Sequence, residues 1–228
     1  MQFNVTPYAK RNALAFCGLS LLLFVLLVFA HLVRDDIPVG VTVVIGATSG
    51  VLLLLGIGKL IEPPVSLAIT PEHITYLHRR GSWQISWDNI IRYDVPRVSR
   101  LLDLEDAPFL GFRLHDIDEV LQSISPRLAS ALLVEQRQLL TMALRHQRPD
   151  KNDYSEYFEI PDKYVSPEGI VYKGLIASFA VRMQQLRELL GYDLYVSATA
   201  LDRDVYEFIA HLHKLQASRN EAASQSDA

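Results

Sequence analysis

A glycine-rich stretch near the N-terminus has the residue types of a phosphate-binding loop. The β-branched run from Val41 is followed by Gly46-Ala47-Thr48-Ser49-Gly50, and dinucleotide-binding enzymes place such a loop between their first strand and first helix. The pattern fails at Leu52, where a further glycine would let the helix pack on the strand. The following residues are uniformly apolar, whereas the helix of such an enzyme is amphipathic. The stretch is therefore not interpreted as a cofactor loop, and no cofactor is predicted.

The other residues that could catalyse a reaction or bind a metal are scattered along the chain. His211 and His213 are two positions apart on a predicted helix, about 200° around its axis, so they cannot share a metal ion. His115, Asp116 and Asp118 form a possible ligand group, but acidic residues before a helix are more typical of a solvated N-terminus. The sequence thus predicts no catalytic residue and no metal site.

A set of arginines around the first predicted sheet is the main polar feature. They could contact anionic lipid headgroups, each contributing about 1 kcal/mol near the membrane surface. The alternative is a solvated sheet face on which nearby aspartates act as ion-pair partners. The candidates for facing a lipid or a partner are Arg79, Arg80, Arg92, Arg97 and Arg100.

Two long apolar stretches form the first elements of the chain. Residues 12–33 and 37–58 each contain 22 residues without Asp, Glu, Lys or Arg, and a helix of this length spans about 33 Å, enough to cross a membrane. The first stretch is longer than the core of a signal peptide, and no Ala-x-Ala-like cleavage site follows it. Residues 1–61 are therefore predicted to form a transmembrane helical hairpin. Gly46 and Gly50 lie four positions apart and could form a helix-packing face, although glycine is common in membrane helices generally.

The charged residues beside these stretches predict the orientation of the hairpin. Lys10, Arg11 and Lys59 flank its outer ends, whereas the connecting loop has one arginine and two aspartates. By the positive-inside rule, both termini face the cytoplasm.

The composition of the remaining chain excludes several classes of protein. Residues 62–228 contain 18 basic and 24 acidic side chains, a net charge of −6, which is the wrong sign for a nucleic-acid-binding domain. Cys17 is the only cysteine, so an internal disulfide and a cysteine-based zinc site are excluded.

The residues after the hairpin are predicted to form strands first and helices later. Strands are predicted at 65–69, 73–79, 83–87, 90–95, 109–114 and 193–198. Trp83, Ile85 and Trp87 alternate with polar residues, which is typical of a sheet with one buried face. Helices are predicted at 118–124, 126–146, 173–190 and 202–215, a polar loop at 147–168, and a disordered tail at 217–228.

The stretch LAITPEHITYLHRRGSWQISWDNIIRY resembles the opening of bacterial PH-like domains. In these domains a strand, a Thr-Pro-Glu-type turn and a hairpin precede an Ile-x-Trp-x-x-Ile segment, here Ile85 to Ile90. The chain also resembles, over most of its length, an uncharacterised gammaproteobacterial family of two-span inner-membrane proteins with such a domain. The resemblance implies a PH-like sheet over residues 65–115 that residues 193–215 complete, with a helical insertion at about 116–190.

The predicted fold class is α+β: an N-terminal transmembrane helical hairpin, then a PH-like antiparallel sheet with a helical insertion and a closing C-terminal helix. The cytoplasmic domain is expected to cover residues 62–216. The predicted protein is a multi-pass protein of the bacterial inner (cytoplasmic) membrane, N-in and C-in. Its predicted role is that of a membrane-tethered, non-enzymatic interaction module for a protein partner or a lipid headgroup. The alternatives are an enzyme with a site in the helical insertion, or a structural subunit that assembles, also as a homo-oligomer, through its membrane helices.

Overall fold

The computed structural model of the chain describes residues 3–7, 12–34, 36–61, 65–100, 103–148, 151 and 153–226. The chain forms two compact units. One unit is residues 7–64, and the other joins residues 1–6 to residues 65–228. The boundary differs from the predicted one, because the residues before the hairpin belong to the larger unit.

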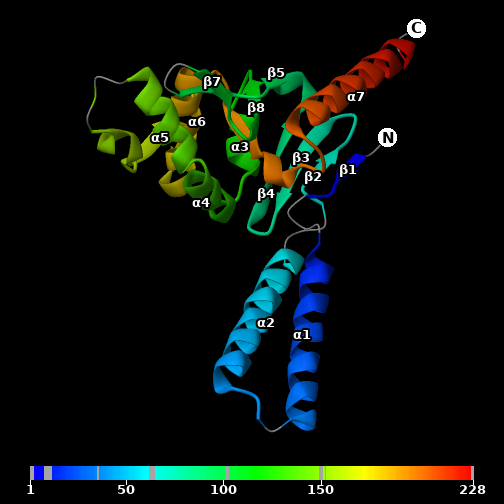
Figure 1. The fold of residues 1–228 in the computed structure, drawn as a ribbon. Helices are drawn as coiled ribbons and strands as arrows, with labels where there is room; N and C mark the ends of the chain where they lie inside the picture. The colour runs from blue at the N-terminus through cyan, green and yellow to red at the C-terminus, as the bar shows by residue number, and fades with distance from the viewer. Residues whose placement is uncertain are drawn as a thin grey trace. The chain divides into compact units, whose positions relative to one another are not determined.

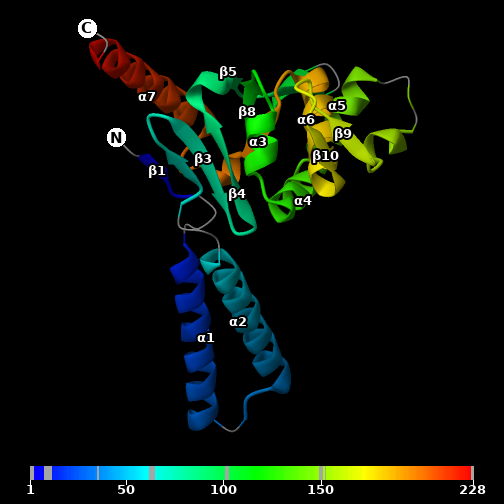
Figure 2. The same ribbon diagram turned by 180° about the vertical axis from the view of Figure 1, so that it is seen from behind.

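The smaller unit contains two long helices, α1 (Ala13–Val33) and α2 (Val39–Leu60), which lie side by side in both views (Figures 1 and 2). Both are long and apolar enough to cross a membrane. Only 11% of the most apolar window of each helix is buried, whereas the core helix of a soluble protein is mostly buried. The outward-facing apolar side chains of this pair favour lipid as their surroundings.

Small residues bring the two helices together. The buried Ser20 hydroxyl donates a hydrogen bond of 2.8 Å to the Ser49 carbonyl oxygen, and the Ser49 hydroxyl donates one of 2.9 Å to the Ser20 carbonyl oxygen. Two turns further along α2, a Cβ atom on Gly56 would lie 3.0 Å from the backbone nitrogen of Cys17 and would clash with the Cys17 sulfur. The absence of a side chain at Gly56 therefore permits the close approach of the helices.

The predicted packing glycines lie outside this closest contact. A Cβ atom on Gly46 would lie 3.9 Å from the Leu27 side chain, and one on Gly50 would have no described neighbour within 4 Å. Ser49 and Gly56 are seven positions apart and share the face toward α1, whereas Gly46, three positions before Ser49, lies at the margin of that face. Packing of Gly46 and Gly50 against a second copy of the chain stays a prediction.

The larger unit combines helices with antiparallel sheets. A four-stranded sheet has the order β1-β2-β3-β4, a three-stranded sheet has the order β11-β8-β5, and two further strand pairs are separate ribbons. None of these sheets closes into a barrel within the described ranges. The strands of the two larger sheets are β1 (Phe3–Val5), β2 (Leu67–Ile69), β3 (His73–His78), β4 (Gly81–Ser86), β5 (Ile90–Asp94), β8 (Phe109–Leu114) and β11 (Leu194–Ser197). The ribbons pair β6 (Arg97–Arg100) with β7 (Asp103–Asp106), and β9 (Lys163–Val165) with β10 (Val171–Lys173).

Five α-helices accompany these strands within the described ranges. They are α3 (Asp118–Ser123), α4 (Pro126–Glu135), α5 (Arg137–Gln147), α6 (Gly174–Leu190) and α7 (Val205–Ser226). The Ser125 side chain caps α4 and Pro126 follows it, a favourable order at a helix start. Within the larger unit, α4, α5 and α6 lie together at the end away from α7 (Figures 1 and 2). These three helices thus pack together beside the sheets.

One hydrophobic core joins the two larger sheets to α3, α4, α6 and α7, and a second cluster contains the buried residues of α5. The first core contains Val5 and Leu67 of the four-stranded sheet, Phe112 of the three-stranded sheet, Phe208 of α7 and many apolar residues between them. The predicted burial of Trp83, Ile85 and Trp87 is confirmed. The strand ends at Ser86, however, and Trp87 opens a 3₁₀ turn (Trp87–Asn89).

The short helix α3 covers the free edge of β4. The backbone N–H of Ser86 donates a 2.7 Å hydrogen bond to the Glu119 carboxylate, and that of Gln84 donates one of 3.2 Å to the Ser123 hydroxyl. Side chains of α3 therefore occupy donors that a further strand would otherwise use, which protects the edge from pairing with another chain.

Some elements differ from the prediction. The helix predicted at 126–146 is divided at Gln136 into α4 and α5. The tail predicted to be disordered from residue 217 is helical as far as Ser226, because its Ala, Glu, Gln and Arg residues have good helix propensity and extend a helix that is already packed. The strands β1, β6, β7, β9 and β10 occur where no strand was predicted.

The burial of Trp87 predicts a large effect on stability. The side chain is 3% exposed, and its indole N–H donates a 2.9 Å hydrogen bond to the Thr70 carbonyl oxygen. We expect Trp87→Ala to lower the free energy of unfolding by about 3–5 kcal/mol, because it opens a cavity. Thermal unfolding of the full chain in detergent should show a melting temperature lower by roughly 6–20 °C. The control is Ser86→Ala, which removes one 3.2 Å bond to Glu119; equal melting temperatures for the two variants would contradict the burial.

Candidate functional site

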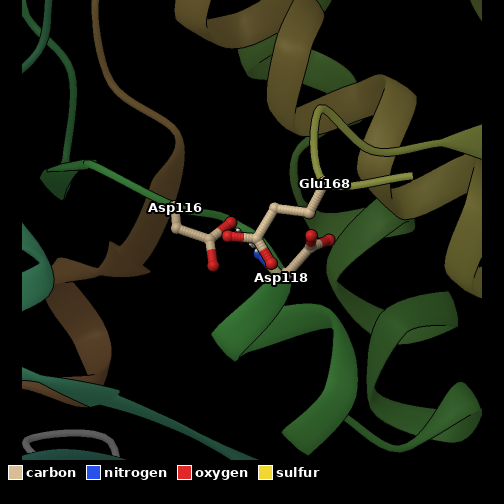
Figure 3. Close-up of side chains that lie close together, drawn as sticks. All are labelled: Asp116, Asp118 and Glu168. Carbon is tan, nitrogen blue, oxygen red and sulfur yellow. Dashed lines mark hydrogen bonds between the residues drawn. The ribbon is translucent and has the colours of Figure 1, made fainter. Parts of the chain in front are cut away.

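Three carboxylates from two distant segments meet beside α3. Asp116 and Asp118 stand at the start of this helix, and Glu168 lies in the turn between β9 and β10. One carboxylate oxygen from each residue lies within 4.8 Å of the other two. Figure 3 shows the Glu168 side chain reaching across from its turn toward the two aspartates. Like charges at this separation repel each other.

A hydrogen-bond network fixes the aspartate side of the cluster. The Asn89 side chain accepts a 2.8 Å bond from the Asp116 backbone N–H, and its amide donates bonds of 2.7 Å to the Asp116 carbonyl oxygen and to the Glu119 carboxylate. The Asp116 carboxylate accepts a 2.8 Å bond from the Asp118 backbone N–H. The 3₁₀ turn between β4 and β5 therefore positions the start of α3.

A tight turn fixes the glutamate side. The Ser166 backbone N–H donates a 2.9 Å bond to the Ile170 carbonyl oxygen, and the Gly169 N–H donates one of 2.9 Å to the Ser166 carbonyl oxygen. Gly169 has a φ of 84°, a conformation that glycine adopts without a steric penalty. Glu168 is thus presented from a closed turn, with its side chain exposed.

Asp118 is the unusual member of the cluster. It is 1% exposed, and neither of its carboxylate oxygens has a hydrogen-bond partner among the described residues. The nearby Tyr172 hydroxyl is also buried without a partner in this part of the chain. Burial raises the pKa of Tyr172 to about 12, and the Asp118 carboxylate, which the Tyr172 hydroxyl approaches without meeting the geometry of a hydrogen bond, adds to this increase. A buried carboxylate without a partner costs several kcal/mol, so a compensating group is expected here.

The negative charge of the other buried aspartate, Asp193, is compensated by neighbouring groups of the protein. Asp193 is also 1% exposed, but it accepts a 2.9 Å hydrogen bond from the Leu114 backbone N–H. The Arg187 and Arg113 guanidinium nitrogens lie 3.4 and 3.8 Å from its oxygens. Burial raises the pKa of Asp193, and the Leu114 hydrogen bond and the two arginines oppose that increase. The protein thus balances one buried carboxylate with cations of its own, and Asp118 lacks such a cation within the described ranges.

The predicted arginine candidates do not belong to one sheet. Arg79 and Arg80 form the turn between β3 and β4. They lie close to His78, whose pKa is lowered first by burial and then by these two positive charges. This pair is the closest grouping among the candidates.

The other three arginines lie on β5 and β6. The Arg92 guanidinium stands over the Tyr192 ring, 5.0 Å from its centre. The Arg97 side chain lies 3.5 Å from the Asp106 carboxylate across the β6–β7 ribbon. Arg100 ends β6. Contact of these arginines with a lipid or a partner stays a prediction.

The sequence predicts two members of the acidic cluster as possible ligands, Asp116 and Asp118, but the solvated surroundings that it predicts for them are wrong for Asp118. His115 is exposed and lies outside the group, whereas Asp118 is buried rather than solvated. The helical period holds a signal for that burial, because Asp118 precedes the buried Leu121 by three positions and shares its face. Glu168 could not be found in this way, since no local spacing links it to α3.

Comparison with known proteins identifies a family for this chain. No curated protein and no solved structure matches the chain. A family model described as "Protein of unknown function (DUF2982)" matches residues 67–218, a range that includes all three carboxylates and leaves out the hairpin and β1. Because the match covers more than half of the chain, the protein belongs to the family of proteins of unknown function DUF2982.

Proposed function

We propose that the protein is a non-enzymatic interaction module, held at the cytoplasmic face of the bacterial inner membrane by its helical hairpin. The observation that carries this proposal is the pairing of β1, which precedes the hairpin, with β2, which follows it. Phe3 pairs with Ile69 and Val5 with Leu67 in an antiparallel register. The Val5 side chain is fully buried in the core of the larger unit. The anchor is therefore an insertion within the domain rather than a tail attached to it.

This pairing supports two membrane crossings. Strands of one sheet lie on the same side of a membrane, so the chain crosses an even number of times between Val5 and Leu67. Two helices of sufficient length lie between these residues. The pairing also argues against α1 as a cleaved signal peptide, because cleavage would remove β1 and leave its place in the core empty. The basic residues Lys10, Arg11 and Lys59 favour the cytoplasm as the side of the domain.

We further infer a PH-like arrangement for the larger unit. The support is that the four-stranded sheet, the three-stranded sheet and α7 contribute to one core. Ile85, Trp87 and Ile90, which carry the resemblance to PH-like domains, are all buried in that core. In this proposal α4, α5 and α6 are an insertion that carries the interaction surface.

Exposed apolar side chains favour a protein as the partner. Val165 and Val171 face each other across the β9–β10 ribbon and are 51% and 53% exposed. Ile160, shortly before the ribbon, is also largely exposed. Neighbouring exposed apolar residues are typical of surfaces that bind other proteins. The five arginines, by contrast, are spread over separate sheets. This arrangement is unfavourable for binding a single lipid headgroup.

The buried β1 strand predicts that the N-terminus stabilises the domain. We expect Val5→Ala to lower the free energy of unfolding by about 1.5–3 kcal/mol, since it removes two buried methyl groups from the core. Thermal unfolding of the full chain in detergent measures this loss. The matched control is Thr6→Ala, because Thr6 is exposed next to Val5. Indistinguishable melting temperatures for the two variants would show that β1 does not pack into the domain.

The even number of crossings predicts the membrane topology. We expect a fluorescent protein fused after Ala228 to be active in the cytoplasm, and a periplasmic phosphatase inserted at Asp36 to be active in the periplasm. Phosphatase activity from a fusion at Ala228 would reverse the orientation and would refute the cytoplasmic location of the module.

The exposed ribbon predicts where a partner binds. A photo-crosslinking residue at Val171 in the full chain, irradiated in its native membrane, should form a discrete adduct with a protein. The same residue at Lys214, exposed on α7, is the control and should form none. Identical adducts from both positions, or no adduct at Val171, would contradict a protein-binding surface on the ribbon.

A further inference from the structure

We propose that Asp116, Asp118 and Glu168 form a binding site for a hard divalent cation, which joins the β9–β10 turn to the start of α3. This inference is independent of the proposed interaction partner. It rests on three convergent carboxylates, on the burial of one of them without a partner, and on the donor atoms that the cluster offers.

The buried carboxylate is the strongest sign of a ligand. Asp118 is 1% exposed, with both oxygens unpartnered among the described residues, and its carboxylate belongs to the cluster. The equally buried Asp193 is balanced by Arg113 and Arg187. A cation bound by Asp118 would supply the positive charge that these arginines supply to Asp193. It would also relieve the repulsion among the three carboxylates.

The donor atoms select the class of cation. All three ligands offer carboxylate oxygen, and the neighbouring His115 is exposed and does not belong to the group. Oxygen-only sites suit Ca²⁺, Mg²⁺ and Mn²⁺, whereas zinc and copper sites usually include nitrogen or sulfur. The cluster is therefore a site for a hard cation.

The origin of the ligands favours Ca²⁺ over Mg²⁺. Ca²⁺ accepts oxygen ligands at about 2.3–2.6 Å in flexible geometries, whereas Mg²⁺ requires a near-ideal octahedron at about 2.0–2.1 Å. The three carboxylates lie within 4.8 Å of one another and come from two separate segments, one of them an exposed turn. Such an irregular set of ligands suits Ca²⁺ better.

The cluster is partly preorganised for binding. One Asp116 oxygen accepts the Asp118 backbone N–H, and the Asn89 side chain holds the backbone of Asp116. Asp118 is fixed by burial. Glu168 is exposed, and its side chain reaches from its turn toward the two aspartates (Figure 3). An ion can therefore enter past Glu168 and meet two aspartates that are already in place.

The first experiment measures thermal unfolding of the full chain in detergent, after chelation and then with added Ca²⁺, Mg²⁺ or Mn²⁺. At about 100 times the dissociation constant, Ca²⁺ should raise the melting temperature by roughly 5–10 °C. Asp118→Asn should abolish this shift and should also raise the melting temperature in chelator, because it removes a buried charge. Asp162→Asn is the control, since Asp162 is an exposed acid just before β9 and outside the cluster, and it should keep the full shift.

A second readout reports the position of the ion. Tb³⁺ binds oxygen sites like Ca²⁺ and emits when a nearby tyrosine is excited; Tyr172 lies beside Asp118. We expect sensitised Tb³⁺ emission from the wild type, displaced by Ca²⁺. Should Asp118→Asn fail to fold, Glu168→Gln changes an exposed residue and should weaken Tb³⁺ binding about tenfold or more, with an unchanged melting temperature in chelator.

Several results would overturn the proposal. One is that none of the three cations raises the melting temperature of the wild type. Another is that a cation raises the melting temperature of the wild type and of Asp118→Asn equally. A third is a Tyr172→Phe variant that is destabilised in chelator when no cation affects the wild type, since the Tyr172 hydroxyl would then be the partner of Asp118.

Discussion

The antiparallel pairing of β1 with β2 is the contact on which the rest of the architecture depends. It places the first residues of the chain in the same sheet as the residues that follow the hairpin. The core of the larger unit includes Val5 from one side of this pair and Leu67 from the other. A gap in the core is unfavourable because it loses apolar burial and packing contacts. The core of the domain is therefore complete only when the residues before the hairpin and those after it have paired.

Helix α3 has a comparable role at the opposite edge of the same sheet, beside β4. It has only six residues, too few to be stable in isolation. Its polar side chains nevertheless cover the edge of β4, bind Asn89 and present Asp118 to the acidic cluster. A short helix is thus stabilised by what it contacts, and the insertion that follows is positioned through it.

The elements that the sequence predicts correctly are those with a local pattern. The alternation of Trp83, Ile85 and Trp87 identified a buried face because strands have a period of two. The length of the apolar stretches identified α1 and α2. The elements that the sequence does not predict depend on distant partners. β1 has three residues and is a strand because β2 is beside it. Glu168 joins the cluster through tertiary contacts alone, and residues 217–226 are helical as a continuation of a packed helix.

The insertion of the hairpin between two paired strands also affects the order of folding. During synthesis β1 leaves the ribosome first, and both membrane helices must follow before β2 is made. β1 therefore waits without a partner while about sixty residues are added, a matter of several seconds at ordinary rates of translation. Insertion of the hairpin into the bilayer would bring the two ends of the helices together and shorten the distance that β1 must search. For a hairpin that inserts as proposed, the membrane would act as a template for closing the first sheet, and the anchor would take part in folding the domain that it holds.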